Sequence, residues 1–257
     1  MAALIAAAAP ARAACPDLAT VARFALALLE RRVPAPFPGL TERDARCAQD
    51  RLVATLAQPW GDVEGVALAA EAEPPLRGAL FHATLRERSG ATVEARFGAR
   101  PAVAPGLLLR IGRDGIEAAT PDALLAHVEA ASPYLALLDL AAMPDAADPA
   151  ARIAGNLGLR LGVVGAAVPL TDAATLAGTG TLQSDGSVVA SLPALGLAAS
   201  PLDLLARLAR DLAAEGRPLR GGEHVALLAA PAPFAPRPGE TWRLSAPGLG
   251  SVSAAFR

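Results

Sequence analysis

Short apolar runs separated by glycine and proline turns fill the chain from about residue 62 to its C-terminus. Each run is long enough for one β-strand, and none has the length or the spacing of a long amphipathic helix. The runs are Gly65–Ala70, Gly78–Leu85, Leu107–Ile111, Tyr134–Leu140, Leu159–Val164, Val225–Ala229, Thr241–Leu244 and Ser251–Phe256. This pattern predicts a β-rich domain over residues 62–257.

Helical signals lie mainly before this domain. Residues 17–32 carry apolar side chains at helical spacing, and Thr41-x-x-Asp44 is typical of the start of a second helix that Gly61 would end. We therefore predict a small two-helix lobe over residues 15–61. Two further helices are expected within the β-rich domain, one beginning at Pro121 and one running from Pro201 to Gly216.

The composition excludes several classes of function. Hydrophobic residues make up 53% of the 257 residues, which suits a large core, and the formal net charge is -2 with no basic cluster interleaved with aromatics. A nucleic-acid partner is therefore not expected. The chain contains no lysine, which excludes Schiff-base catalysis.

Residues 1–14 form an apolar, alanine-rich leader in which Ala11-Arg12-Ala13 fits a small-x-small cleavage pattern. We predict a signal peptide here, and hence a periplasmic or secreted protein. The alternative is an alanine-rich leader on a cytoplasmic protein. No apolar run reaches the roughly 20 residues that span a bilayer, so no membrane span is expected.

Cys15 and Cys47 are the only cysteines. Two antiparallel helices would bring them together, and an oxidising compartment would favour a disulfide between them; two unrelated thiols are the alternative. Their spacing matches no zinc motif, and the chain has only three histidines, so a Cys/His metal site is not expected.

A series of motifs in the C-terminal third suggests a family. In order they are Ser200-Pro201-Leu202, Gly216-x-Pro218-Leu219-x-x-Gly222, Gly239-Glu240 and Gly248-Leu249-Gly250-Ser251-Val252. This succession resembles the 2-keto-4-pentenoate hydratase branch of the fumarylacetoacetate hydrolase superfamily. The resemblance extends over about 17–256. It implies an α+β fold, a mixed β-roll of the fumarylacetoacetate hydrolase C-terminal-domain type with a small two-helix N-terminal lobe.

The resemblance also implies a chemistry. Those enzymes hold Mg²⁺ or Mn²⁺ with a Glu-x-Glu pair on one strand and a third acid on a neighbouring strand, because hard cations prefer carboxylate oxygens. In this chain the three acid positions fall on Ala104, Gly106 and Ala136, and the family's strand lysine falls on Ala67. We therefore expect no metal cofactor, since the ligands that the family uses are absent.

Five other residues are candidates for a site. Asp139 and His82 are weak catalytic candidates, the second as a general base. Arg110 and Arg160 lie in apolar strand runs, where a guanidinium binds a carboxylate well, and Asn156 falls where the family has a polar residue near its site. For each of them a structural or surface role is the alternative.

These observations favour a hydratase-like protein that is non-catalytic or altered, a pseudoenzyme that binds a small organic acid or a partner protein. The alternative is an active, divergent hydratase or lyase acting on a small 2-oxo acid through Asp139, His82 and Arg110. A third reading is self-association as a homo-oligomer. The sequence does not decide whether the protein is an enzyme.

Overall fold

The computed structural model describes residues 15–70, 74–145, 147–229 and 233–257. The predicted signal peptide, residues 1–14, lies outside these residues. No helix in the described ranges is long and apolar enough to cross a membrane.

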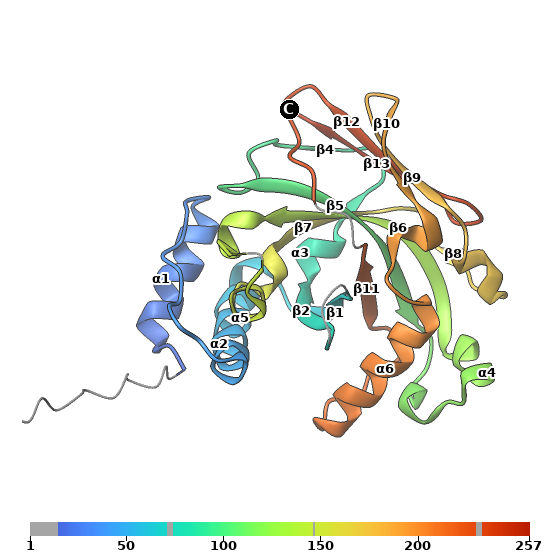
Figure 1. Cartoon of the computed structure of the whole chain (residues 1–257), viewed down its shortest axis with the longest axis horizontal. Helices are drawn as coiled ribbons and strands as arrows, with labels where there is room; N and C mark the ends of the chain where they lie inside the picture. Colours follow the sequence, from blue (N-terminus) through green and yellow to red (C-terminus); the bar gives the residue numbers. More distant parts are fainter. Residues whose placement is uncertain (1–14, 71–73, 146, 230–232) are drawn as a thin grey trace, which may run out of the picture.

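Two helices, α1 (Leu18–Leu29) and α2 (Glu42–Trp60), form the N-terminal part of the fold (Figure 1). Side-chain caps start both of them, because the Asp17 carboxylate accepts from the Thr20 amide at 2.6 Å and the Thr41 hydroxyl accepts from the Asp44 amide at 3.2 Å. Their facing sides are apolar and pack with the end of strand β2 (Leu76–Phe81). The buried residues of this cluster are Val21, Phe24, Ala25, Leu28, Leu52, Leu56, Phe81 and Ala142.

The disulfide that the sequence suggested is present. Cys15 and Cys47 are bonded, with their Cα atoms 5.7 Å apart, and the bond ties the chain before α1 to the second turn of α2. It closes a loop with a sequence separation of 32 residues.

Opening this bond is expected to lower the free energy of unfolding by about 3–4 kcal/mol, because the unfolded chain regains the freedom of the closed loop. Urea denaturation of the oxidised protein and of a Cys15→Ser/Cys47→Ser variant measures the difference. The control is a reductant, which should destabilise the parent protein and leave the variant unchanged. Equal midpoints for the oxidised protein and the variant would contradict the expectation.

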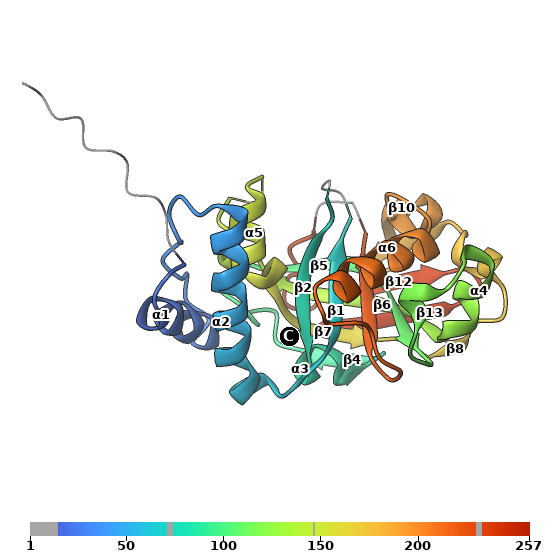
Figure 2. The same cartoon turned by 90° about the horizontal axis from the view of Figure 1, so that it is seen from below.

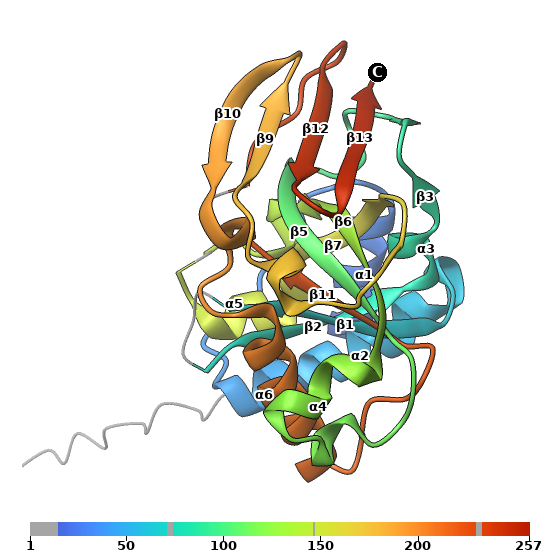
Figure 3. The same ribbon diagram turned by 90° about the vertical axis from the view of Figure 1, so that its right-hand side faces the viewer.

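The larger sheet has eight strands, seven of them in the order β2-β1-β11-β5-β6-β7-β3, and β8 pairs with β6. The strands are β1 (Val63–Ala69), β2 (Leu76–Phe81), β3 (Glu87–Arg88), β5 (Pro101–Ile111), β6 (Val128–Asp139), β7 (Leu159–Val164), β8 (Val168–Pro169) and β11 (His224–Leu228). The short helix α3 (His82–Leu85) leads from β2, at one end of this order, to β3 at the other. The sheet is therefore curled rather than flat (Figure 3).

A second sheet of five strands covers part of the first, in the order β10-β9-β12-β13-β4. Its strands are β4 (Ala91–Val93), β9 (Gly180–Ser184), β10 (Ser187–Leu192), β12 (Thr241–Ala246) and β13 (Gly250–Phe256). Leu182 and Val252 of this sheet pack with Leu135 and Leu137 of β6, all of them fully buried. This contact holds the central strand β6 between two apolar layers.

The remaining helices are α4 (Pro121–Leu124), α5 (Pro149–Ala154) and α6 (Pro201–Ala214), with short 3-10 turns η1 (Ile116–Ala118), η2 (Leu125–His127), η3 (Leu140–Ala142), η4 (Asn156–Gly158), η5 (Ala173–Leu176) and η6 (Pro193–Gly196). Leu205, Leu208 and Leu212 of α6 pack on Leu109 and Val225 of the larger sheet. Seen from below, α2 and α6 flank strands β1 and β2 (Figure 2).

The prediction of an α+β fold rich in strands is confirmed. One difference is local. The apolar run predicted as a strand over Gly78–Leu85 ends as a strand at Phe81, and α3 takes its last residues. The Thr84 hydroxyl donates to the Phe81 carbonyl at 2.6 Å, which stabilises this turn of helix.

Candidate ligand-binding site

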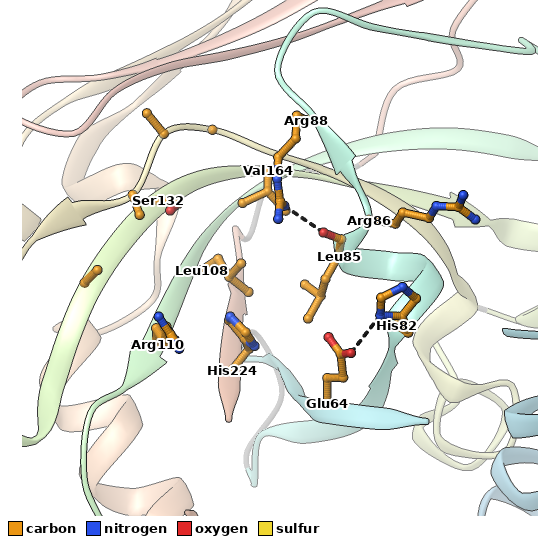
Figure 4. Close-up of a pocket in the computed structure, with 14 residues that line it drawn as sticks. Glu64, His82, Leu85, Arg86, Arg88, Leu108, Arg110, Ser132, Val164 and His224 are labelled. Carbon is orange, nitrogen blue, oxygen red and sulfur yellow. Dashed lines mark hydrogen bonds and ion pairs between the residues drawn. The ribbon is translucent and has the colours of Figure 1, made fainter. Parts of the chain in front are cut away.

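A pocket of about 630 Å³ opens between strands β5, β6 and β11 and the α3–β3 connection. We call it the His224 pocket (Figure 4). Its lining residues are Glu64, His82, Leu85, Arg86, Arg88, Leu108, Arg110, Ala130, Ser132, Val164, Gly165, Ala166, Ala167 and His224. Such a volume suits a small organic molecule.

Strand geometry explains why these side chains meet. Leu108 and Arg110 are two residues apart on β5, so both point to the same side of the sheet. The β5–β11 register places His224 beside Arg110, and the parallel β1–β11 register places Gly65 beside His224. Glu64 therefore comes close to His224, although the two residues are far apart in the sequence.

The pocket is rich in positive charge. Three guanidinium groups line it, from Arg86, Arg88 and Arg110, and Glu64 is the one carboxylate among its lining residues. Arg110 also pairs with Glu129, at 3.0 Å, and Arg88 donates to the Leu85 carbonyl at 2.8 Å. These contacts hold the guanidinium groups of Arg88 and Arg110 in place, and the pocket keeps an excess of positive charge.

His82 and Glu64 form a dyad at the pocket wall. Nδ1 of His82 lies 2.7 Å from Oε1 of Glu64, and Figure 4 shows the two side chains pointing toward one another. When Nδ1 donates to this carboxylate, Nε2 is left as the nitrogen that a ligand can meet. The arrangement suits a proton acceptor whose ring is held by an acid.

Burial lowers the pKa of His224 below its ordinary value of 6.5. The nearby Glu64 opposes this shift, whereas the charges of Arg110 and Arg88 add to it. Nδ1 of His224 is buried and has no hydrogen-bond partner among the described residues. His224 is therefore neutral at neutral pH.

A pH dependence of anion binding follows. As the pH falls through the lowered pKa of His224, the ring gains a proton and the pocket gains positive charge. Affinity for a dicarboxylate such as adipate should rise about tenfold between neutral and mildly acidic pH, the size of one charge-assisted hydrogen bond. Calorimetric titration at several pH values measures it. His224→Gln should flatten the profile, and a variant profile as steep as the parent's would show that other groups cause the effect.

The structure brings together only two of the five residues that the sequence suggested. His82 and Arg110 line the His224 pocket. Asp139, Asn156 and Arg160 lie elsewhere, around a cavity of about 10 Å³. That cavity holds at most a water molecule.

The protein itself engages each of these three side chains. Asp139 is buried and accepts from the amides of Ala99, Arg100 and Ala141. The Asn156 amide pairs with both the N–H and the C=O of Ala79. Arg160 donates to the Phe97 carbonyl at 2.8 Å, and its guanidinium lies 5.0 Å from the ring centre of Trp60.

The positions that the resemblance assigned to metal ligands lie side by side. Ala104 is directly opposite Ala136, and Gly106 is opposite Tyr134. Tyr134 is fully buried, and its hydroxyl donates to the Thr84 carbonyl at 3.1 Å. A Cβ atom added at Gly106 would lie 2.9 Å from the Leu227 carbonyl oxygen, so a larger side chain does not fit there without a backbone shift.

These positions do not fit a hard dication, because alanine and glycine offer no side-chain oxygen. Over the described parts of the chain there is also no group of three or more His, Cys, Asp or Glu residues that could hold a metal ion.

No protein-family model and no curated protein matches the chain. Solved structures do. The chain is similar to 4-oxalocrotonate decarboxylase from Pseudomonas putida G7, complexed with magnesium and adipate, with a TM-score of 0.82 and 20% identity over 93% of this chain and 97% of that one. The chain shares the fold of these solved structures, which agrees with the fold that the resemblance in the sequence implied.

Two further solved structures match a smaller part of the chain. Fumarylpyruvate hydrolase from Pseudomonas aeruginosa, in complex with Mn²⁺ and pyruvate, has a TM-score of 0.57 at 17% identity over 75% of this chain and 89% of that one. A fumarylacetoacetate hydrolase family protein from Yersinia pestis CO92 has a TM-score of 0.58 at 14% identity over 76% and 92%. The match to the decarboxylase covers more of this chain than these two matches do, 93% against 75% and 76%.

The comparison corrects one expectation. We expected no metal cofactor, and the structural neighbours contradict this: the decarboxylase is complexed with magnesium in one structure and with calcium in another, and the hydrolase with manganese. That expectation rested on the absence of acids at Ala104, Gly106 and Ala136. The absence rules out one arrangement of metal ligands and no other. The affinity of this chain for Mg²⁺ and Mn²⁺ therefore has to be measured.

Proposed function

We propose that this chain binds a small organic acid with two carboxyl or oxo-acid groups in the His224 pocket, as a ligand-binding or chemically altered relative of the superfamily's enzymes. One observation carries the proposal: three arginines and two histidines surround a single carboxylate in a pocket of about 630 Å³. The neighbouring structures hold the small organic acids adipate, acetate and pyruvate, of which adipate is a dicarboxylate.

The placement of the charges favours a dicarboxylate over a monocarboxylate. Arg110 projects from β5, whereas Arg86 and Arg88 belong to the α3–β3 connection. In Figure 4 these two sources of charge lie on different walls of the pocket. An acid with a carboxylate at each end can pair with both walls, and a guanidinium offers each carboxylate two parallel hydrogen bonds.

Calorimetric titration with adipate, succinate and pyruvate tests the proposal. Adipate and succinate should bind more tightly than pyruvate, and adipamide, the uncharged diamide, should bind at least tenfold more weakly than adipate. Each titration is run with Mg²⁺, with Mn²⁺ and with neither ion, so that a contribution of the cation is seen directly. Equal binding of adipate and adipamide would overturn the proposal.

The His82–Glu64 dyad favours a second candidate function, hydration or lysis of a small 2-oxo acid. In this reading Nε2 of His82 moves a proton at the bound acid while Glu64, 2.7 Å from Nδ1, holds the ring. Turnover of 2-hydroxypenta-2,4-dienoate is the assay, with and without Mg²⁺. His82→Ala should abolish turnover and His127→Ala, a matched change outside the pocket, should not; absence of turnover in the parent protein removes this candidate.

We also propose that the chain is exported and matures by loss of residues 1–14. The disulfide between Cys15 and Cys47 supports this, because such bonds persist mainly in oxidising compartments. Mass spectrometry of the protein recovered from a periplasmic fraction tests it, and an intact N-terminus in a cytoplasmic fraction would contradict it.

A further inference from the structure

A second cavity, of about 470 Å³, lies between helices α2 and α6 over strands β1 and β2. We call it the α2–α6 groove, and Figure 2 shows the two helices on either side of these strands. Its lining residues are Arg46, Gln49, Asp50, Val53, Val63, Gly65, Val66, Arg77, Gly78, Ala79, Leu212, Glu215 and Arg217. It is separate from the His224 pocket, since the two share no lining residue.

Positive charge exceeds negative charge in this groove. Glu215 is shared by two guanidiniums, because it pairs with Arg77 and also, at 3.1 Å, with Arg217. Arg77 is held further by Gln49, whose Nε2 donates to the Arg77 carbonyl at 2.7 Å. Asp50 is the other acid of the lining, and Arg46 has no hydrogen bond or ion pair with any described residue. An incoming carboxylate would therefore find a guanidinium that none of the acids in the described part of the chain occupies.

The rest of the lining is apolar. Val53 from α2, Val66 from β1 and Leu212 from α6 form a wall, and Leu212 is buried. Val63 is 46% exposed, which makes it one of a few large apolar side chains in the described chain that face solvent. A ligand that covered Val63 would remove this apolar surface from water.

We propose that the α2–α6 groove is a second ligand site, for a small monocarboxylate with a compact apolar body, such as an aromatic or branched short-chain acid. The carboxylate pairs with Arg46 and Arg217, and the apolar body covers Val63 and Val66. The ligand class differs from that of the His224 pocket, where charge surrounds the ligand and favours an acid with two charged ends.

Titration with benzoate tests this site. Arg46→Ala should weaken benzoate binding about tenfold, the loss of one charge-assisted hydrogen-bonded pair. Arg43→Ala is the matched control, because Arg43 is exposed on the same helix and does not line the groove. Val63→Asp, which places a like charge beside the ligand's expected position, should abolish binding. Benzamide, the uncharged analogue, should bind at least tenfold more weakly than benzoate.

The proposals for the two sites can be tested independently of each other. Arg46→Ala should leave adipate affinity unchanged within twofold, and Arg110→Ala should do the same for benzoate. Thermal unfolding of each variant checks that it is folded. Equal benzoate affinities of the Arg46→Ala and Arg43→Ala variants would overturn the proposal, and so would a loss of benzoate binding on Arg110→Ala, which would place benzoate in the His224 pocket.

Discussion

Replacing Asp139 by alanine is expected to lower the free energy of unfolding by about 3–5 kcal/mol. The side chain is 1% exposed, and its two oxygens accept hydrogen bonds from the amides of Ala99, Arg100 and Ala141. Alanine would leave three N–H groups without this partner, two of them in the turn that leads into β5. Urea denaturation of both proteins measures the change.

Two controls separate this cause from the loss of charge. Asp139→Asn keeps one carbonyl oxygen as an acceptor in nearly the same volume. Its free energy of unfolding should therefore lie between that of the parent and that of the alanine variant. Asp211→Ala removes an exposed carboxylate from α6 and should change stability by no more than about 0.5 kcal/mol. An Asp139→Ala protein as stable as the parent would show that Asp139 does not organise the turn, and would reopen its role at a site.

The sequence predicts those parts of the fold that depend on neighbours in the chain. Thr41 and Gly61 bound α2 as expected, and Pro201 begins α6. Each is a local cap or break whose effect needs no tertiary contact. The strand over Leu159–Val164 was also predicted with its observed ends, because its residues are apolar apart from Arg160 and both sides of it are mostly covered.

The β9–β10 hairpin was missed for the opposite reason. Its second strand lies at the edge of the smaller sheet, and most of its side chains are exposed, so it carries little apolar pattern. The Asp185-Gly186 turn was the available signal, since both residues have the positive φ that a tight hairpin turn requires. An edge strand takes its structure from its partner more than from its own composition.

The site could be predicted only in part. His82 and Arg110 were candidates, but Glu64 and His224 were not, because the parallel pairing of β1 with β11 that joins them is a long-range contact. The sequence did show a polar residue at the start of each of these apolar strands. Which two strands would lie next to each other was not visible in it.

Replacing both Arg88 and Arg110 by alanine is expected to reduce adipate affinity at least about 100-fold, because hydrogen bonds to charged groups contribute roughly 1.5–3 kcal/mol each. The two residues come from different strands, β3 and β5, and both line the His224 pocket. Each single variant should lose about tenfold. Titration calorimetry gives all four affinities, and Arg243→Ala, an exposed arginine on β12 outside the pocket, is the control.

The same variants decide what supplies the positive charge that adipate meets. If guanidinium groups carry recognition, Arg→Lys at both positions restores only part of the affinity, since an ammonium keeps the charge but loses the paired hydrogen bonds. Adding Mg²⁺ then leaves the order of the variants unchanged. If a cation carries recognition, adipate binds the double alanine variant as tightly as the parent once Mg²⁺ is present. That result would contradict the assignment of the arginines and place the acid on a metal.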